Sequence, residues 1–235
     1  MWMVTRTDVG LLRDGNEDYV SAHPEGGFAV LADGMGGLAA GEVASREATQ
    51  VVVEALEERR HRKAARIESA IRAADSAIYE INVGRLPKKP MGTTLVVWCR
   101  TGDSAALVAH VGDSRAYWFD GDNLQRLTND HSVVQDMVND GMMTEKEAHN
   151  APNRHVLTQA IGIGERLDVA LTQLDYSPGD RFLLCSDGLS DMVEHEPLQA
   201  MFRRQLGLEE LADALLQAAL AAGGYDNISL VLIEV

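Results

Sequence analysis

Apolar residues recur along this chain with two different spacings, and each spacing predicts a different kind of element. Between residues 43 and 56, and again between 67 and 81, they return every three or four positions, which is typical of amphipathic helices. We expect these two helices to form an antiparallel pair, and we expect a last helix from about residue 208 to 222. Short apolar runs typical of buried strands cover residues 28–32, 93–99, 105–111, 115–119, 123–127, 169–174, 181–185 and 228–235.

Turn residues separate the four strands between residues 93 and 127, so a β-meander is expected there. Residues 136–154 are polar with weak periodicity, which predicts a short helix and a surface loop. Antiparallel strands interrupted by helix pairs favour an α+β fold of sheets covered by helices over a doubly wound parallel sheet. The 235 residues are 46% apolar and contain no Pro/Gly/Ser-rich linker, so we expect a single domain over residues 1–235.

Acidic residues recur beside glycine or asparagine just beyond the predicted strands. The four pairs are Asp33-Gly34, Gly112-Asp113, Asp187-Gly188 and Asp226-Asn227. Each pair alone is an ordinary turn sequence, but strand ends can present all four carboxylates to one site, and a neighbouring glycine lets the backbone approach closely. Carboxylates gathered without nearby Lys or Arg repel each other, which implies bound cations. Oxygen ligands favour magnesium or manganese over zinc, and no H-x-H or H-E-x-x-H pair is present.

Charge and cysteine content exclude several classes of protein. The formal net charge is −15, and the basic residues form no single stripe, so nucleic acid is not an expected partner. No apolar run is long enough to span a bilayer and no secretory or lipidation signal is visible, so we expect a cytoplasmic protein without membrane contact. Cys99 and Cys185 lie in predicted buried strands, which indicates neither a disulfide nor a catalytic thiol.

The order and flanks of the acidic motifs are more specific than any one of them. In chain order, the motifs are RDGNED at 13–18, ADGMGG at 32–37, MGTT at 91–94, VGDSR at 111–115, SDGL at 186–189 and DNIS at 226–229. This series resembles the metal-dependent protein phosphatases of type 2C, in the compact form common in bacteria, and it covers essentially the whole chain. The resemblance implies a four-layer α-β-β-α sandwich, in which helix pairs flank a central antiparallel β-sandwich with two metal ions at one end.

The resemblance also implies a role for each acidic motif. Asp33 would bridge both metal ions, the carbonyl of Gly34 would bind the first, and Asp18 would contact the first through water. Asp187 and Asp226 would bind the second ion. A weaker third ion would be held by Asp113 together with Asp187, and Asp191 is a further candidate for that site.

The implied reaction is hydrolysis of phosphoserine and phosphothreonine by in-line attack of a metal-bridging hydroxide, with no covalent intermediate. Arg13 matches the arginine that binds the substrate phosphate, because a guanidinium forms two parallel hydrogen bonds to phosphate oxygens. Related enzymes often carry a histidine, a candidate general acid, where this chain has Met35 or Leu38. Water, or His131, must then protonate the leaving oxygen.

Residues of about 135–162 correspond to the variable flap beside the active site, which bears on substrate choice, whereas the stretch at 153–158 is expected to be structural. Expected partners are phosphorylated proteins, including a serine/threonine kinase and its substrates, and a monomer is expected. Two alternatives remain open at this stage. One is a catalytically silent, phosphatase-like regulatory module that binds but does not hydrolyse, and the other is a phosphoesterase acting on small molecules.

Overall fold

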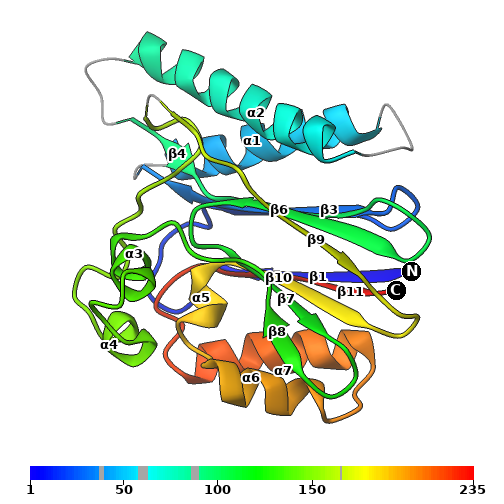
Figure 1. Ribbon diagram of the computed structural model, residues 1–235. Helices are drawn as coiled ribbons and strands as arrows, with labels where there is room; N and C mark the ends of the chain where they lie inside the picture. The colour runs from blue at the N-terminus through cyan, green and yellow to red at the C-terminus, as the bar shows by residue number, and fades with distance from the viewer. Residues whose placement is uncertain (37–39, 58–62, 86–89, 165) are drawn as a thin grey trace.

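Two antiparallel sheets pack face to face, and helices cover the outer face of each sheet (Figure 1). This arrangement comes from a computed structural model that describes residues 1–36, 40–57, 63–85, 90–164 and 166–235. Helices α1 (Ala40–Glu57) and α2 (Ala64–Arg85) cover one sheet, and α6 (His195–Phe202) and α7 (Leu208–Ala221) cover the other. The predicted fold class, a four-layer α-β-β-α sandwich, is confirmed.

The first sheet has the strand order β2-β3-β5-β6-β9, and β4 pairs with β3 beside it. The strands are β2 (Asp18–His23), β3 (Phe28–Met35), β4 (Gly92–Thr93), β5 (Leu95–Arg100), β6 (Ala105–Val111) and β9 (Ala170–Asp175). The second sheet has the order β1-β11-β10-β7-β8. Its strands are β1 (Trp2–Asp8), β7 (Arg115–Phe119), β8 (Leu124–Arg126), β10 (Arg181–Cys185) and β11 (Ile228–Glu234).

The predicted β-meander over residues 93–127 is wrong, because the chain changes sheets at Gly112. Strands β5 and β6 belong to the first sheet, whereas β7 and β8 belong to the second. Gly112 adopts a φ of 99°, and a Cβ there would lie 2.7 Å from the Thr94 side chain. The dipeptide Gly112-Asp113 is therefore a crossing point between the sheets and not a hairpin turn.

The central strands read as continuous apolar runs because both of their faces are buried. On β3, Ala29 and Leu31 pack between the two sheets, while Phe28 and Val30 pack under α1 and α2. The ring of Trp98 lies 5.3 Å from that of Phe182 across the sandwich. A separate apolar cluster joins the second sheet to α6 and α7. Burial on both faces explains why hydrophobicity alone cannot tell which sheet a strand joins.

The expected helices at 43–56, 67–81 and 208–222 are confirmed, but several other elements differ from the predictions. Strands β1 and β2 were not expected. Both lie at sheet edges, and most of their residues are half-exposed, so neither forms a continuous apolar run. Helix α6 was also missed. Residues 136–154 contain two short helices in place of one, α3 (Val133–Asn139) and α4 (Glu145–His149), and a capping box between Thr144 and Glu147 begins the second.

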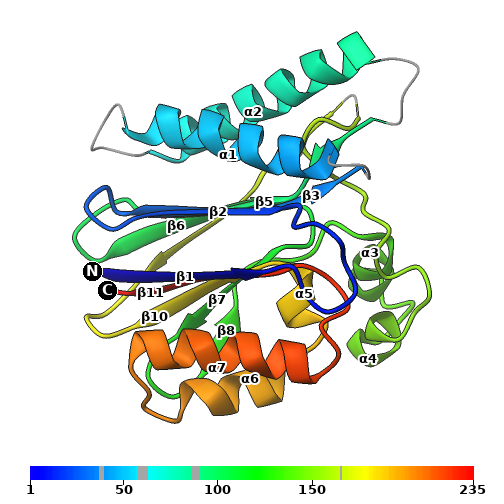
Figure 2. The ribbon, with the colours of Figure 1, turned by 180° about the vertical axis from the view of Figure 1, so that it is seen from behind.

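One end of the sandwich gathers the loops that follow the acidic motifs. Helices α3, α4 and the short α5 (Asp187–Ser190) lie at this end, opposite the two chain termini (Figure 2). Cys99 and Cys185 are buried in the sheets as expected, and burial raises the pKa of Cys185 to about 12. Among the described residues, no helix combines the length and apolar character that crossing a bilayer requires.

Candidate metal centre and active site

Asp18 and Asp33 are direct partners across the β2–β3 ladder, so the sheet holds their carboxylates side by side. Burial raises the pKa of Asp33 well above its ordinary value, and the negative charges of neighbouring carboxylates raise it further. Those neighbours are Asp18, Asp187, Asp113 and Asp226. The five aspartates predicted from the sequence therefore converge at one end of the sandwich, although they come from five separate segments of the chain.

The carboxylate of Asp18 is buried and only partly satisfied. The Ser186 hydroxyl donates a hydrogen bond of 2.9 Å to its Oδ2 atom, whereas its Oδ1 atom has no hydrogen-bond partner among the described residues. Burial raises the pKa of Asp18 to about 7, hydrogen bonds from Ser229 and Ser186 lower it, and the charges of Asp187 and Asp226 raise it. An oriented, desolvated carboxylate oxygen of this kind is suited to a cation.

Threonines of the motif at 91–94 hold the backbone of Asp33 in place. The hydroxyl of Thr93 donates to the carbonyl of Asp33 at 2.8 Å, and the Asp33 amide donates to the Thr94 hydroxyl at 3.0 Å. The Thr94 hydroxyl also lies 2.7 Å from that of Ser114, the residue after Asp113. These contacts link the end of β3 to the segment that crosses between the sheets, so the motif has a supporting role.

The glycines of the Asp-Gly motifs allow close backbone contacts. A Cβ at Gly34 would lie 2.1 Å from the carbonyl oxygen of Gly41 at the start of α1. A Cβ at Gly188 would lie 2.0 Å from the carbonyl oxygen of Asn227. Real Cβ atoms cannot approach that closely, so both positions require glycine, as the sequence predicted.

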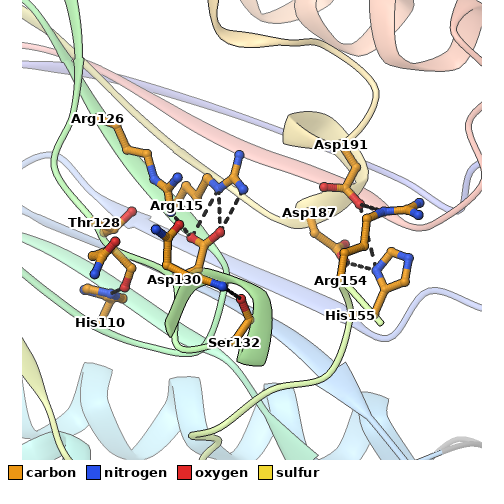
Figure 3. Close-up of polar contacts among 12 residues, drawn as sticks. His110, Arg115, Arg126, Thr128, Asp130, Ser132, Arg154, His155, Asp187 and Asp191 are labelled. Atoms are coloured by element: carbon orange, nitrogen blue, oxygen red, sulfur yellow. Dashed lines mark hydrogen bonds and ion pairs between the residues drawn. The ribbon is translucent and has the colours of Figure 1, made fainter. Parts of the chain in front are cut away.

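Asp187 begins α5, and its Oδ1 atom is a second buried carboxylate oxygen without a hydrogen-bond partner in the described part of the chain. Asp191 follows one turn later, and Arg154 donates to its Oδ2 atom at 3.2 Å (Figure 3). The Nδ1 atom of His155 lies 3.8 Å from the Oδ2 atoms of both aspartates. These three side chains, His155, Asp187 and Asp191, are close enough to share one ion.

Arg154 and His155 were not recognised as site residues from the sequence. Arg154 was expected to be structural, and His131 was the histidine considered for a catalytic role. The structure instead brings both residues against α5, although more than 30 positions separate them from Asp187 and Asp191 along the chain. No local spacing signals such a contact, because it depends on how the flap folds back over the sandwich.

Asp113 lines a pocket of about 730 Å³ beside this cluster, between the flap and helices α5 and α6. Burial raises the pKa of Asp113 well above its ordinary value, the charges of Asp187 and Asp130 raise it further, and Arg115 lowers it. Asp130 is paired with Arg115 at 2.7 Å and also with Arg126 (Figure 3). The three residues of this ion-pair network line the pocket, and Arg115 begins β7 directly after the crossing segment that carries Asp113.

Arg13 donates a 2.6 Å hydrogen bond to Oδ2 of Asp226, another aspartate of the cluster. Asn227 fixes this arrangement, because its side-chain Nδ2 atom donates to the backbone carbonyls of Val9 and Gly15, both at 2.9 Å. The N-terminal loop and the loop before β11 therefore form one hydrogen-bonded unit. Arg13 is placed where a guanidinium can reach an anion at the edge of the carboxylate cluster.

His131 is held by the fold in a structural position. Its Nδ1 atom accepts a hydrogen bond from the Gly112 amide at 3.4 Å, and its ring stacks on that of His110 at 4.8 Å. Burial lowers the pKa of His131, which favours the neutral ring. Met35 ends β3, and Leu38, the other position noted for its lack of histidine, lies outside the described residues.

Comparison with known proteins supports the same family. The sequence profile of the family described as protein phosphatase 2C matches residues 13–222. The serine/threonine protein phosphatase PstP of Mycobacterium tuberculosis is 40% identical over 236 residues, which are 98% of this chain and 44% of that protein. This chain thus spans less than half the length of that relative. The serine/threonine phosphatase stp of Listeria innocua is 32% identical over 97% of this chain and 94% of its own length.

Solved structures extend the likeness to the fold. The catalytic domain of the serine/threonine protein phosphatase PstP, in complex with two manganese ions, aligns with a TM-score of 0.86 at 35% identity. The alignment covers 99% of this chain and 97% of that one. Profile, sequence relatives and fold agree with the resemblance seen in the motifs, and this chain belongs to the protein phosphatase 2C family.

Proposed function

We propose that this protein is a metal-dependent protein phosphatase that hydrolyses phosphoserine and phosphothreonine. The observation that supports this most is the convergence of five carboxylates at one end of the sandwich, two of which present buried oxygens that lack a hydrogen-bond partner among the described residues. Desolvated carboxylates at this density are costly unless cations neutralise them. Arg13 at the edge of the cluster supplies the positive charge that a phosphate ester needs.

We assign two divalent cations, manganese or magnesium, to this centre. The residues that would hold them are Asp18 (through water), Asp33, Gly34 (through its carbonyl), Asp187 and Asp226. A third, weaker ion is assigned to Asp113 and Asp187. The all-oxygen donor set supports hard cations, and the manganese complex of a relative supports manganese.

When bound, divalent cations would supply an acidified water able to attack phosphorus near neutral pH. The protein contributes orientation, because Asp33 is fixed by the two threonines beneath it and Asp18 by the hydroxyl of Ser186. Arg13 binds the equatorial phosphate oxygens, whose charge is spread in the transition state. His131 is half-buried, burial lowers its pKa, and its ring is stacked on that of His110, so solvent protonates the leaving oxygen.

The proposed substrates are phosphorylated proteins, including those modified by a serine/threonine kinase, with the chain acting as a single catalytic domain and as a monomer. A silent binding module is disfavoured because every expected carboxylate is present and converges. A phosphoesterase for small molecules is disfavoured because the pocket beside Asp113 is lined by opposite charges that largely pair with one another.

The test is phosphate release by metal-stripped protein from a phosphothreonine peptide, an aryl phosphate and a nucleoside monophosphate. Manganese, magnesium or no metal is added back, and Asp33→Ala serves as the control. The proposal predicts metal-dependent hydrolysis of the peptide and the aryl ester that the variant lacks. Hydrolysis of the nucleotide alone would favour the small-molecule alternative, and no release from any substrate would favour the binding module.

A further inference from the structure

Large apolar side chains are exposed on the two loops that meet at Arg13 and Asp226. Leu11, Leu12 and Tyr225 are 64%, 68% and 58% exposed, and Val9 beside them is 36% exposed. Leu12 directly precedes Arg13, and Tyr225 directly precedes Asp226. We call the four residues Val9, Leu11, Leu12 and Tyr225 the apolar rim. Exposed apolar groups that gather at one place mark a binding surface more often than scattered ones do.

The two loops of the apolar rim form one rigid surface. The Leu11 amide donates to the Gly224 carbonyl at 2.7 Å, and a Cβ at Gly224 would lie 3.1 Å from Cγ of Leu11. Gly10 adopts a φ of 77° and fits against the carbonyl of Asp226, where a Cβ would lie only 2.2 Å away. The Tyr225 ring lies against Gly223, where a Cβ would be 2.5 Å from it, so close backbone packing and small residues hold the two loops together beneath the exposed side chains.

The apolar rim is continuous with the position proposed for the substrate phosphate. An extended peptide advances about 3.3 Å per residue, so residues within two positions of a phosphorylated side chain lie within roughly 7 Å of it along the chain. Leu12 adjoins Arg13, and Tyr225 adjoins Asp226, the hydrogen-bond partner of Arg13, so both lie within reach of one flank of a peptide whose phosphate is bound at Arg13. An acidic flank would be disfavoured there, since the protein has a net charge of −15 and offers apolar groups at this point.

Resting on the function proposed above, we propose that the apolar rim binds a large apolar side chain within two residues of the phosphothreonine or phosphoserine of a substrate protein. Tyr225 and Leu12 contact this side chain and remove its apolar surface from water, which strengthens binding of the peptide. The rim therefore selects among phosphorylated proteins by sequence, whereas a small aryl phosphate reaches the metal centre without touching it. Burial of one such side chain is expected to favour the apolar peptide by roughly tenfold or more in kcat/KM.

The experiment measures kcat/KM of the manganese-loaded full chain for two series of phosphothreonine peptides. Each peptide carries either Leu or Ser at a single position, and that position is one of the two residues before or the two residues after the phosphothreonine. Wild type is expected to prefer a Leu peptide roughly tenfold, and the double variant Leu12→Ser/Tyr225→Ser is expected to reduce this ratio to about one. Tyr225→Phe is expected to keep the preference, because the ring remains. Tyr79→Ser, which removes an exposed ring on α2, is the matched control and keeps it as well.

The ratio of kcat/KM for the Leu peptide to that for the Ser peptide, measured on one variant, does not depend on the fraction of active protein. If wild type cleaves the aryl phosphate but treats all peptides alike, or if the double variant keeps the full preference, the inference is overturned. If wild type releases phosphate from no substrate, the proposed function itself fails. The two failures are therefore distinguishable.

Discussion

The buried carboxylate of Asp18 gives the sharpest test of how this site trades stability for cation binding. Its side chain is desolvated, one oxygen lacks a hydrogen-bond partner among the described residues, and burial raises its pKa from an ordinary value of 3.8 to about 7. Asparagine has the same shape, still accepts the hydrogen bond from Ser186, and carries no charge. We therefore expect Asp18→Asn to stabilise the metal-stripped protein while weakening metal binding.

The sign and size of this stability difference follow from the linkage between proton binding and folding. The folded protein binds the Asp18 proton more tightly than the unfolded chain does, so its stability falls as pH rises from 3.8 to about 7 and then stays level. A difference of about three pKa units corresponds to roughly 4 kcal/mol at pH 8, and to almost nothing near pH 4. For a domain of this size, each kcal/mol shifts Tm by about 2 to 4 °C.

Thermal and urea unfolding of metal-stripped wild type and Asp18→Asn, between pH 5 and 8, measure this difference directly. The variant should be more stable by several kcal/mol at pH 8, up to about 4 kcal/mol, with a smaller gain at pH 5. Asp103→Asn, at an exposed carboxylate, is the control and should change little. Equal stability of variant and wild type at pH 8, or a gain that does not vary with pH, would refute the reasoning.

Three further changes probe other parts of the site. Replacing Arg13 by Ala removes a charged donor to the phosphate and should lower kcat/KM for phosphopeptides by roughly 10- to 150-fold, measured by phosphate release; an unchanged value would exclude Arg13 from phosphate binding. Gly188→Ala places a Cβ 2.0 Å from the carbonyl oxygen of Asn227 and should destabilise by about 3 kcal/mol or more, whereas Gly84→Ala, with open space around it, should not. His131→Asn should lower Tm but leave the pH dependence of kcat unaltered, because the half-buried ring stacked on His110 is not the general acid. Loss of one limb of the pH profile would contradict this.

The parts of the fold that the sequence predicted are those set by local pattern. The helices at 43–56 and 67–81 follow from their spacing, and the central strands from their continuous apolar runs. Sheet membership did not follow, because a strand buried on both faces looks the same in either sheet. The edge strands β1 and β2 were missed for the opposite reason, since half-exposed residues interrupt their apolar pattern.

The residues of the candidate site also divide into those that local sequence pattern predicted and those that it did not. Four of the five aspartates were found because each stands beside a glycine or asparagine, and at Gly34 and Gly188 the local backbone requires the glycine. Asp18 has no such neighbour and was found only through the resemblance of the motif at 13–18. His155 and Arg154 were not found, because their contacts with Asp187 and Asp191 depend on the path of the flap. Sequence patterns therefore reveal the carboxylates that strand ends present, and they miss the side chains that a returning segment brings to the same place.

The converging aspartates are proposed to hold catalytic divalent cations, and titration of Mn²⁺ into metal-stripped protein, followed by electron paramagnetic resonance of the free ion, measures that binding. Wild type is expected to bind at least two ions, Asp33→Ala to lose this binding, and Asp103→Asn to keep it. Binding by Asp33→Ala that equals wild type in number and affinity would show that the aspartates do not form the metal centre.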